Sequence, residues 1–209
     1  MPEVTASTAS DGITRAAPAA LERISATLAR AFHEDPVLGW VVPDPERRRA
    51  CLPPFFAVQA EAYLALDETH LAGEGEAVAL WAPPGTAAVD GDGADAYVER
   101  LAAILGPDAE RGGQVEEAIA EHHPEEPCWY LQWLAVLPEH RGAGLGGRLL
   151  RTVLDRCDAT ATPAYLEATS EHNRSLYARH GFEVTAEARL PDGGPTLWPM
   201  WREPASASG

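Results

Sequence analysis

The stretch that decides the fold is Leu131-Gln-Trp-Leu-Ala-Val-Leu-Pro-Glu-His-Arg141-Gly-Ala-Gly-Leu-Gly-Gly147. An apolar run ends at a proline, four glycines follow within six positions, and a helical pattern begins there. This order predicts a strand, a tight loop and the start of a helix. Glycine lets a ligand approach the backbone with no Cβ in the way, and the first amides of a helix are unpaired. The stretch therefore predicts a phosphate-binding loop, to which Arg141 adds a positive charge.

Three other interpretations of this loop are weaker. Glycine clusters most often mark ordinary turns, but four glycines beside an arginine are more than a turn requires. Gly142, Gly144 and Gly147 also fit the G-x-G-x-x-G of a dinucleotide site, with Glu167 about twenty residues further on. Only about sixty residues follow that motif, however, which is too few for the strands and helices of such a fold. A Walker loop requires a lysine, and this sequence contains none.

Two ordered motifs resemble those of the GNAT acyltransferase superfamily. Arg141-Gly-Ala-Gly144-Leu-Gly146 is similar to its Q/R-x-x-G-x-G/A acetyl-CoA signature, and Asn173-Arg-Ser-Leu-Tyr177-Ala-Arg-His-Gly181-Phe182 resembles its second signature. The resemblance is strong from Trp129 to Val184 and looser over three further stretches, which are similar to puromycin N-acetyltransferase-like members. Those stretches are Ala31-Phe-His-Glu-Asp-Pro36, Val78-Ala-Leu-Trp81 and Trp198-Pro-Met-Trp-Arg202.

Length and composition predict one domain. The 209 residues, 45% of them hydrophobic, can bury one sizeable core. We expect flexible ends at residues 1–10 and 204–209 and a single N-acetyltransferase domain over 11–203. Residues 11–127 should form mainly its acceptor half and 128–203 mainly its acetyl-CoA half. The three cysteines lie far apart without close Cys or His partners, so neither a disulfide framework nor a metal site is expected.

The charge of the chain bears on its partners and location. A formal net charge of -16 repels nucleic acid and anionic membranes, so neither is an expected partner. The same field attracts a cationic amine, although a solvated acidic surface explains the charge equally well. No apolar run reaches the roughly 18 residues of a membrane span, and the first residues do not resemble a secretory signal. We therefore expect a cytoplasmic protein, and its arginine-only basic residues fit a GC-rich, bacterial genome.

The remaining pattern predicts an α/β fold with a mixed sheet. Strands are expected at 13–16, 70–73, 77–82, 128–137, 165–169, 182–189 and 196–201. Helices are expected at 18–35, 46–66, 94–105, 107–122, 146–157 and 175–180. The strands at 70–73 and 77–82 should form a hairpin, and the strand-helix-strand unit after 128 should be parallel and right-handed. Because proline breaks or kinks a helix, Pro53 and Pro54 should divide 46–66 into two segments.

The resemblance implies a GNAT-like fold in which the fourth and fifth strands, here 131–137 and 165–169, splay apart and admit the pantetheine arm of acetyl-CoA. Backbone groups of Leu134, Ala135 and Val136 would bind that arm like an added strand, with core packing as the alternative role of their side chains. Asn173 would also contact the cofactor, although it lies closer to Tyr177 than in many members. The loop amides would bind the pyrophosphate, and they belong to Arg141, Gly142, Ala143, Gly144, Leu145, Gly146 and Gly147.

Acetyl transfer to an amine needs a neutral nucleophile and a proton for the departing thiolate. The resemblance assigns that proton to Tyr177, whose ring could equally be packed in the core. Glu167 is the leading candidate for the base that deprotonates the ammonium, but a carboxylate capping the strand or paired with Arg174 is an equal alternative. The pair His122 and His123 is the second candidate for the base. Adjacent histidines without a third ligand do not indicate a metal site.

We therefore expect an acetyl-CoA-dependent N-acetyltransferase that acetylates a primary amine, in the first place that of a small molecule, by direct attack in a ternary complex. No cysteine occupies a plausible nucleophile position, which argues against an acyl-enzyme. Two alternatives stay open: a non-catalytic acyl-CoA-binding sensor or regulatory module, and a protein or peptide acetyltransferase. A homodimer also stays open. Aromatic residues of the acceptor half are expected mostly in the core, with a few lining an apolar pocket: Phe32, Trp40, Phe55, Phe56, Tyr63 and Trp81.

Overall fold

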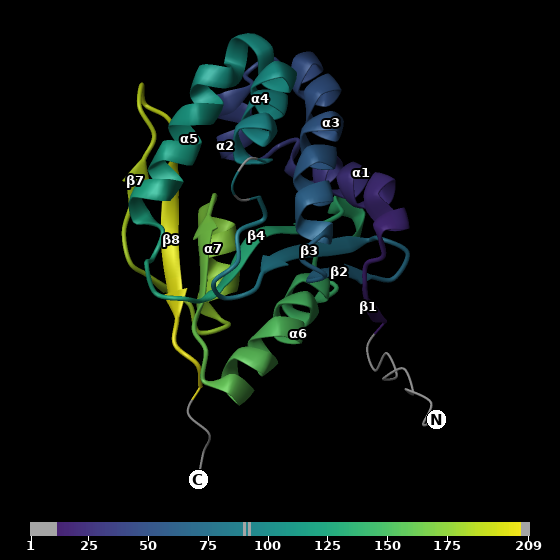
Figure 1. Cartoon of the computed structure of the whole chain (residues 1–209), viewed down its shortest axis with the longest axis vertical. Coiled ribbons are helices and arrows are strands. Elements are labelled where there is room, and N and C mark those ends of the chain that lie inside the picture. The colour runs from purple at the N-terminus through teal and green to yellow at the C-terminus, as the bar shows by residue number, and fades with distance from the viewer. Residues whose placement is uncertain (1–11, 90, 92, 206–209) are drawn as a thin grey trace.

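The computed structural model describes residues 12–89, 91 and 93–205 (Figure 1). The expected flexible segment 1–10 and residues 206–209 of the expected tail lie outside the described residues. The strands are β1 (Ile13–Arg15), β2 (Thr69–Ala72), β3 (Ala77–Ala82), β4 (Trp129–Val136), β5 (Ala164–Ala168), β6 (Glu183–Val184), β7 (Ala188–Arg189) and β8 (Thr196–Arg202). The α-helices are α1 (Leu21–Phe32), α2 (Pro36–Val41), α3 (Pro45–Leu64), α4 (Gly93–Leu105), α5 (Ala109–His122), α6 (Leu145–Thr160) and α7 (Glu171–Ala178). Short 3-10 helices cover Pro18–Ala20 (η1), Gly106–Asp108 (η2) and Pro138–His140 (η3).

The strands form one mixed, 8-stranded sheet, which confirms the expected fold class. Its order is β1-β2-β3-β4-β5-β8-β6, and β7 pairs with β8. The hairpin of β2 and β3 is antiparallel, as expected, and β4 pairs with β5 in parallel across α6. The other pairs of neighbouring strands in this sheet are antiparallel.

The two parallel strands at the centre of the sheet separate partway along their length. Their pairing runs from Trp129 with Ala164 to Leu131 with Leu166 and then stops, although β4 continues to Val136. On its other side β4 remains paired with β3 as far as Val136. The edge of β4 that faces β5 therefore has no strand partner beyond Leu131 among the described residues.

Helices cover both faces of the sheet, and each face has its own core. Apolar side chains of α1 and α3 pack with Val78 and Leu80 of β3. The apolar face of α6 packs with Ala79 and Trp81 on the opposite side of the same strand. This alternation follows from the two-residue period of a strand and explains why β3 is buried on both faces. Figure 1 shows α3 above the sheet and α6 below it.

One expectation about the third helix was wrong. Pro53 and Pro54 do not divide α3, which is continuous over Pro45–Leu64. Both prolines face solvent, as do the residues four positions before them, so the carbonyls that lose a helical partner can bind water. Packing of the buried face of α3, with Phe55 and Phe56, outweighs the lost hydrogen bonds.

The preceding helix was expected to end before Pro36, and α1 does so at Phe32. Pro36 opens the short helix α2, which was not expected, because proline fits the first helical turn and the Asp35 side chain caps its amides. The expected strand at 182–189 is likewise two short strands, β6 and β7.

Candidate active site

The glycine-rich loop joins β4 to α6 through η3, as its sequence predicts. Gly142 and Gly144 adopt left-handed backbone conformations with φ of 83° and 75°, which strain any residue with a Cβ. A Cβ at either position would meet nothing within 4 Å, so the space beside both is open. Gly144 caps α6 without a side-chain hydrogen bond, and the first amides of that helix therefore remain available to a ligand.

A cavity of about 560 Å³ lies between this loop, β4, α7 and the start of α2. It brings together most of the residues expected to bind the cofactor. Ala143 lies in the same loop but does not line the cavity. The predicted residues that do line it are Leu134, Ala135, Val136, Arg141, Gly142, Gly144, Leu145, Gly146, Gly147, Asn173 and Tyr177.

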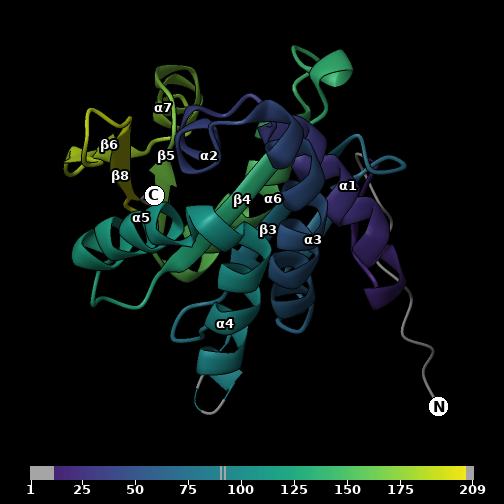
Figure 2. The ribbon, with the colours of Figure 1, turned by 90° about the horizontal axis from the view of Figure 1, so that it is seen from above.

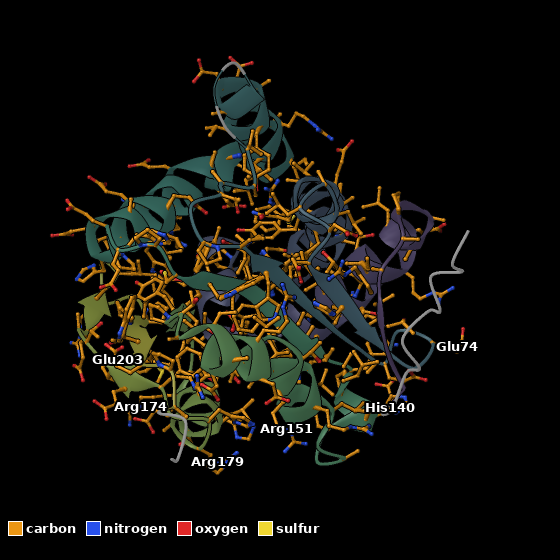
Figure 3. The ribbon with its side chains drawn as sticks, turned by 60° about the horizontal axis from the view of Figure 1, so that its bottom comes forward. Glu74, His140, Arg151, Arg174, Arg179 and Glu203 are labelled. Atoms are coloured by element: carbon orange, nitrogen blue, oxygen red, sulfur yellow. The ribbon has the colours of Figure 1, made fainter. Side chains whose placement is uncertain are left out.

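Basic side chains gather at this first cavity despite the acidic composition of the chain. His140, Arg141, His172 and Arg179 line it. The Arg141 guanidinium is held at the loop by donating to the carbonyls of Ala31 at 3.1 Å and of Val136 at 3.4 Å. In Figure 3, His140 and Arg179 extend outward on the same side of the ribbon. The part of the cavity beside the loop and Arg179 therefore favours an anion, whereas Glu34 and Asp35 line another part.

Tyr177 projects from α7 into the wall of the first cavity and is 6% exposed. Its ring centroid lies 6.0 Å from that of Phe182. Burial raises the pKa of the phenol, and the nearby negative charge of Asp35 raises it further. The hydroxyl is therefore protonated at neutral pH. The ring is packed, and it also borders the cavity, so the two roles expected for it are compatible.

A second cavity of about 280 Å³ adjoins the first and is enclosed by α2, α3, α4, α5, β4 and β5. Figure 2 shows α3, α4 and α5 grouped around β4. Its walls are mostly apolar and include the rings of Phe55, Tyr97, Tyr130 and Trp133. Its charged lining residues are all acidic: Asp35, Glu116 and Glu167.

Glu167 lies on β5 just beyond the last residue pair with β4 and faces the second cavity. Its Oε2 accepts a hydrogen bond of 2.9 Å from the hydroxyl of Tyr130, while Oε1 is buried without a hydrogen-bond partner in the described structure. Burial raises the pKa of this carboxyl to about 7, against the lowering effect of Tyr130. The alternative pairing with Arg174 is not seen, because that guanidinium stacks on Trp198 at 5.2 Å.

Asp35 lines both cavities, and sequence reasoning missed it. Its Oδ1 accepts from the amides of Val37 at 2.9 Å and Leu38 at 3.1 Å, and its Oδ2 accepts from the Thr169 hydroxyl at 2.5 Å. Burial raises the pKa of Asp35, and the bond from Thr169 opposes this rise. An aspartate directly before a proline was the available signal, since this pair is typical of a helix start. The Asn173 amide reaches the same Thr169 hydroxyl at 3.5 Å.

The second candidates for the base do not reach either cavity. His122 bonds to the Ala118 carbonyl at 2.9 Å, within its own helix. The His123 ring packs against Tyr130 and Tyr165, at centroid distances of 4.9 and 5.2 Å, and burial lowers its pKa. Neither histidine lines a cavity, and neither do the three buried cysteines. Among the described residues no group of three or more His, Cys, Asp or Glu could hold a metal ion.

Comparisons with known proteins agree with this fold. Residues 108–184 match the family model of the acetyltransferase (GNAT) domain. The chain is 22% identical over 180 residues to an uncharacterized N-acetyltransferase of Schizosaccharomyces pombe, covering 77% of this chain and 70% of that protein.

Among solved structures, a histone acetyltransferase HPA2 and related acetyltransferase of Corynebacterium glutamicum is 30% identical, with a TM-score of 0.71. That match covers 94% of this chain and 98% of the other. Arylalkylamine N-acetyltransferase 2 of Aedes aegypti shares the fold at 14% identity, with a TM-score of 0.59 and coverage of 91% and 97%.

The fold, the glycine-rich loop and the matches to known proteins together define an acetyltransferase. The chain belongs to the GNAT family, and it is an N-acetyltransferase. In the part of the chain that the structure describes, no helix has the length and apolar character needed to cross a membrane.

Proposed function

We propose that the chain transfers the acetyl group of acetyl-CoA to a primary amine of a small molecule, by direct attack in a ternary complex. One observation carries this proposal. Two adjoining cavities differ in charge, one with basic residues beside a glycine-rich loop and one with acidic residues only, and Asp35 borders both. An anionic cofactor and a cationic acceptor can therefore bind side by side and meet at that border.

The first cavity fits acetyl-CoA, which supplies the acyl group as a thioester. The uncapped amides of Leu145, Gly146 and Gly147 suit its pyrophosphate, together with Arg141 and the open backbone at Gly142, Ala143 and Gly144. The free edge of β4 at Leu134, Ala135 and Val136 suits the amides of the pantetheine arm. Asn173 lines the same cavity and would contact the cofactor.

Glu167 and Tyr177 are the groups that we propose to move protons. Glu167 takes a proton from the acceptor ammonium, since a carboxyl with a pKa of about 7 is half ionised near neutral pH. The amine nitrogen then forms a bond to the thioester carbonyl carbon, and the carbon-sulfur bond breaks. Tyr177, which burial keeps protonated, gives its proton to the departing thiolate, and the second proton that the acetylated nitrogen must lose returns to the Tyr177 phenolate. The location of the three cysteines away from both cavities supports direct attack over an acyl-enzyme.

The shape of the second cavity favours a small acceptor over a peptide. It is walled by four helices and two strands, whereas a peptide needs an open groove with free backbone partners. Some solved structures with this fold are N-acetyltransferases of agmatine or arylalkylamines, but at 14–17% identity that likeness concerns the fold. The preference for a small acceptor therefore rests on the second cavity of this chain.

Further expectations remain proposals of the same kind. Residues 11–127 supply most of the lining of the second cavity and 128–203 most of that of the first, which supports the division into acceptor and cofactor halves within one domain. A puromycin N-acetyltransferase-like affiliation, a cytoplasmic location, a bacterial source and a homodimer rest on sequence alone.

The test combines calorimetry with coenzyme A and detection of free thiol. We expect coenzyme A to bind and acetyl-CoA to release thiol only when a suitable amine is present. Binding without release across a broad amine panel would favour the sensor, and release with peptides alone would favour a protein acetyltransferase. Absence of both binding and release would reject the proposal.

A further inference from the structure

The second cavity contains more negative charge than one acceptor amine needs. Glu116 from α5 and Glu167 from β5 face it together, and the charge of Glu116 contributes to the raised pKa of Glu167. No arginine or histidine is among the residues that line it, in the described part of the chain. Two carboxylates that repel each other at the lining of one cavity are stabilised by a bound cation.

Asp35 and Glu167 each have a partner in the protein. Asp35 caps α2 and accepts from Thr169, and Glu167 accepts from Tyr130. Glu116 differs, because it has no hydrogen bond or ion pair with any described residue. The residue is exposed, but it lines the second cavity, and desolvation there raises the pKa of its carboxyl.

The phenols near Glu116 cannot serve as its donors. The hydroxyl of Tyr97 donates to Gln59 Oε1 at 2.7 Å, and that of Tyr63 donates to Gln132 Oε1 at 2.9 Å. Both hydroxyl protons are therefore used in hydrogen bonds to glutamines. Burial raises the pKa of both phenols, and the negative charge of Glu116 raises it further. Tyr97 also presents its ring to the cavity, and an aromatic ring beside a carboxylate is a favourable site for a cation.

The reacting amine provides only one positive charge, and in the proposed function it transfers the proton that carries this charge to Glu167. We propose, on the basis of that function, that the acceptor carries a second cationic group on an apolar body, and that Glu116 binds this group and selects for it. The acceptor class is then a diamine, or an amine with another fixed cation, whose apolar part lies along Phe55 and Trp133.

The experiment compares kcat/KM for diamines with isosteric monoamines in which a methyl group replaces one amino group. The pairs are para-xylylenediamine with para-ethylbenzylamine, cadaverine with hexylamine, and octamethylenediamine with nonylamine. For the wild type we expect the best diamine to exceed its monoamine by about tenfold, above the roughly twofold advantage of having two reactive ends. In the Glu116→Gln variant this ratio should fall to about two.

Glu117→Gln is the matched control, because Glu117 is the neighbouring residue on the same helix and is exposed like Glu116, but it does not line the cavity. It removes the same charge and should keep the wild-type ratio. Calorimetry with the diamine and coenzyme A-bound wild type gives a readout independent of turnover, and coenzyme A affinity checks the fold of Glu116→Gln.

The outcomes separate the two proposals. If no amine releases thiol, the proposed function fails. If monoamines match or exceed diamines in every pair, the function stands and the second cation is wrong. If diamines are preferred but Glu116→Gln keeps the full ratio, the cation is bound elsewhere and the assignment to Glu116 is overturned.

Discussion

Replacing Glu167 by glutamine should change the pH dependence of activity. With a pKa raised from 4.5 to about 7 by burial, the carboxyl of the wild type is largely protonated in weak acid and cannot accept a proton. We therefore expect kcat/KM to rise about tenfold per pH unit up to about pH 7, level off, and fall where the acceptor ammonium deprotonates. In the Glu167→Gln variant, kcat/KM should no longer rise toward pH 7. The rate should be about a hundredfold or more below that of the wild type.

The same substitution should increase the stability of the folded protein above pH 7, although it lowers the activity. Because the folded state raises the pKa of Glu167, it favours the protonated carboxyl, and this contribution is present below about pH 4.5 and lost as pH rises through about 7. A rise from 4.5 to about 7 corresponds to at most about 3 kcal/mol. Above pH 7 the Glu167→Gln variant should thus be more stable than the wild type by up to about 3 kcal/mol. Near pH 4.5 the two should be equal.

Urea unfolding on either side of pH 7 measures this difference, and thiol release over the same range measures the rate. Glu183→Gln, at an exposed position of β6, controls for the loss of one negative charge. The reasoning is refuted if Glu167→Gln keeps the wild-type limb, or if its stability relative to the wild type does not change with pH. A lost limb with unchanged stability would mean that the raised pKa exists only with substrates bound.

Three further predictions concern the cofactor side and the acceptor. Tyr177→Phe should lower kcat by about tenfold or more while calorimetry shows coenzyme A affinity within about twofold, and unchanged turnover would remove the phenol from the mechanism. Gly144→Ala adds a Cβ at φ 75°, so it should cost about 1 kcal/mol of stability and weaken coenzyme A binding severalfold. Gly193→Ala, at φ 73° with equally open space and lining neither cavity, should cost similar stability but leave that affinity intact. Equal affinity in both glycine variants would contradict the role of the loop. The third prediction is the preference for diamines and its loss in the Glu116→Gln variant, both measured as ratios of kcat/KM.

The cofactor side was predictable because its signals are local in sequence. A strand, glycines with open neighbours and a helix start follow one another within Leu131 to Gly147, and backbone conformation alone makes them a loop with free amides. The separation of β4 from β5 came from the family resemblance, since nothing in the residues of either strand specifies where their pairing stops.

The acceptor side was not predictable in the same way. Asp35 bonds to Thr169 across 134 positions of the chain, and no sequence pattern links two residues at that distance. Glu116 is one of several exposed glutamates on an acidic helix, and only the packing of α5 against α2 and α4 makes it part of a cavity. The continuous α3 shows the same limit, because tertiary packing outweighed the local effect of Pro53.

Hydrogen bonding decides between the two buried carboxyls that could act as base. Asp35 lies at the border of the cavities, which makes it the nearer candidate by position, but its two oxygens together accept three hydrogen bonds. A proton on either oxygen would displace one of these donors, at the end of α2 or at Thr169. Glu167 has an oxygen without any donor, so it can take a proton without breaking a bond. Asp35 then fixes the wall between the two cavities, and we propose Glu167 as the group that takes the proton.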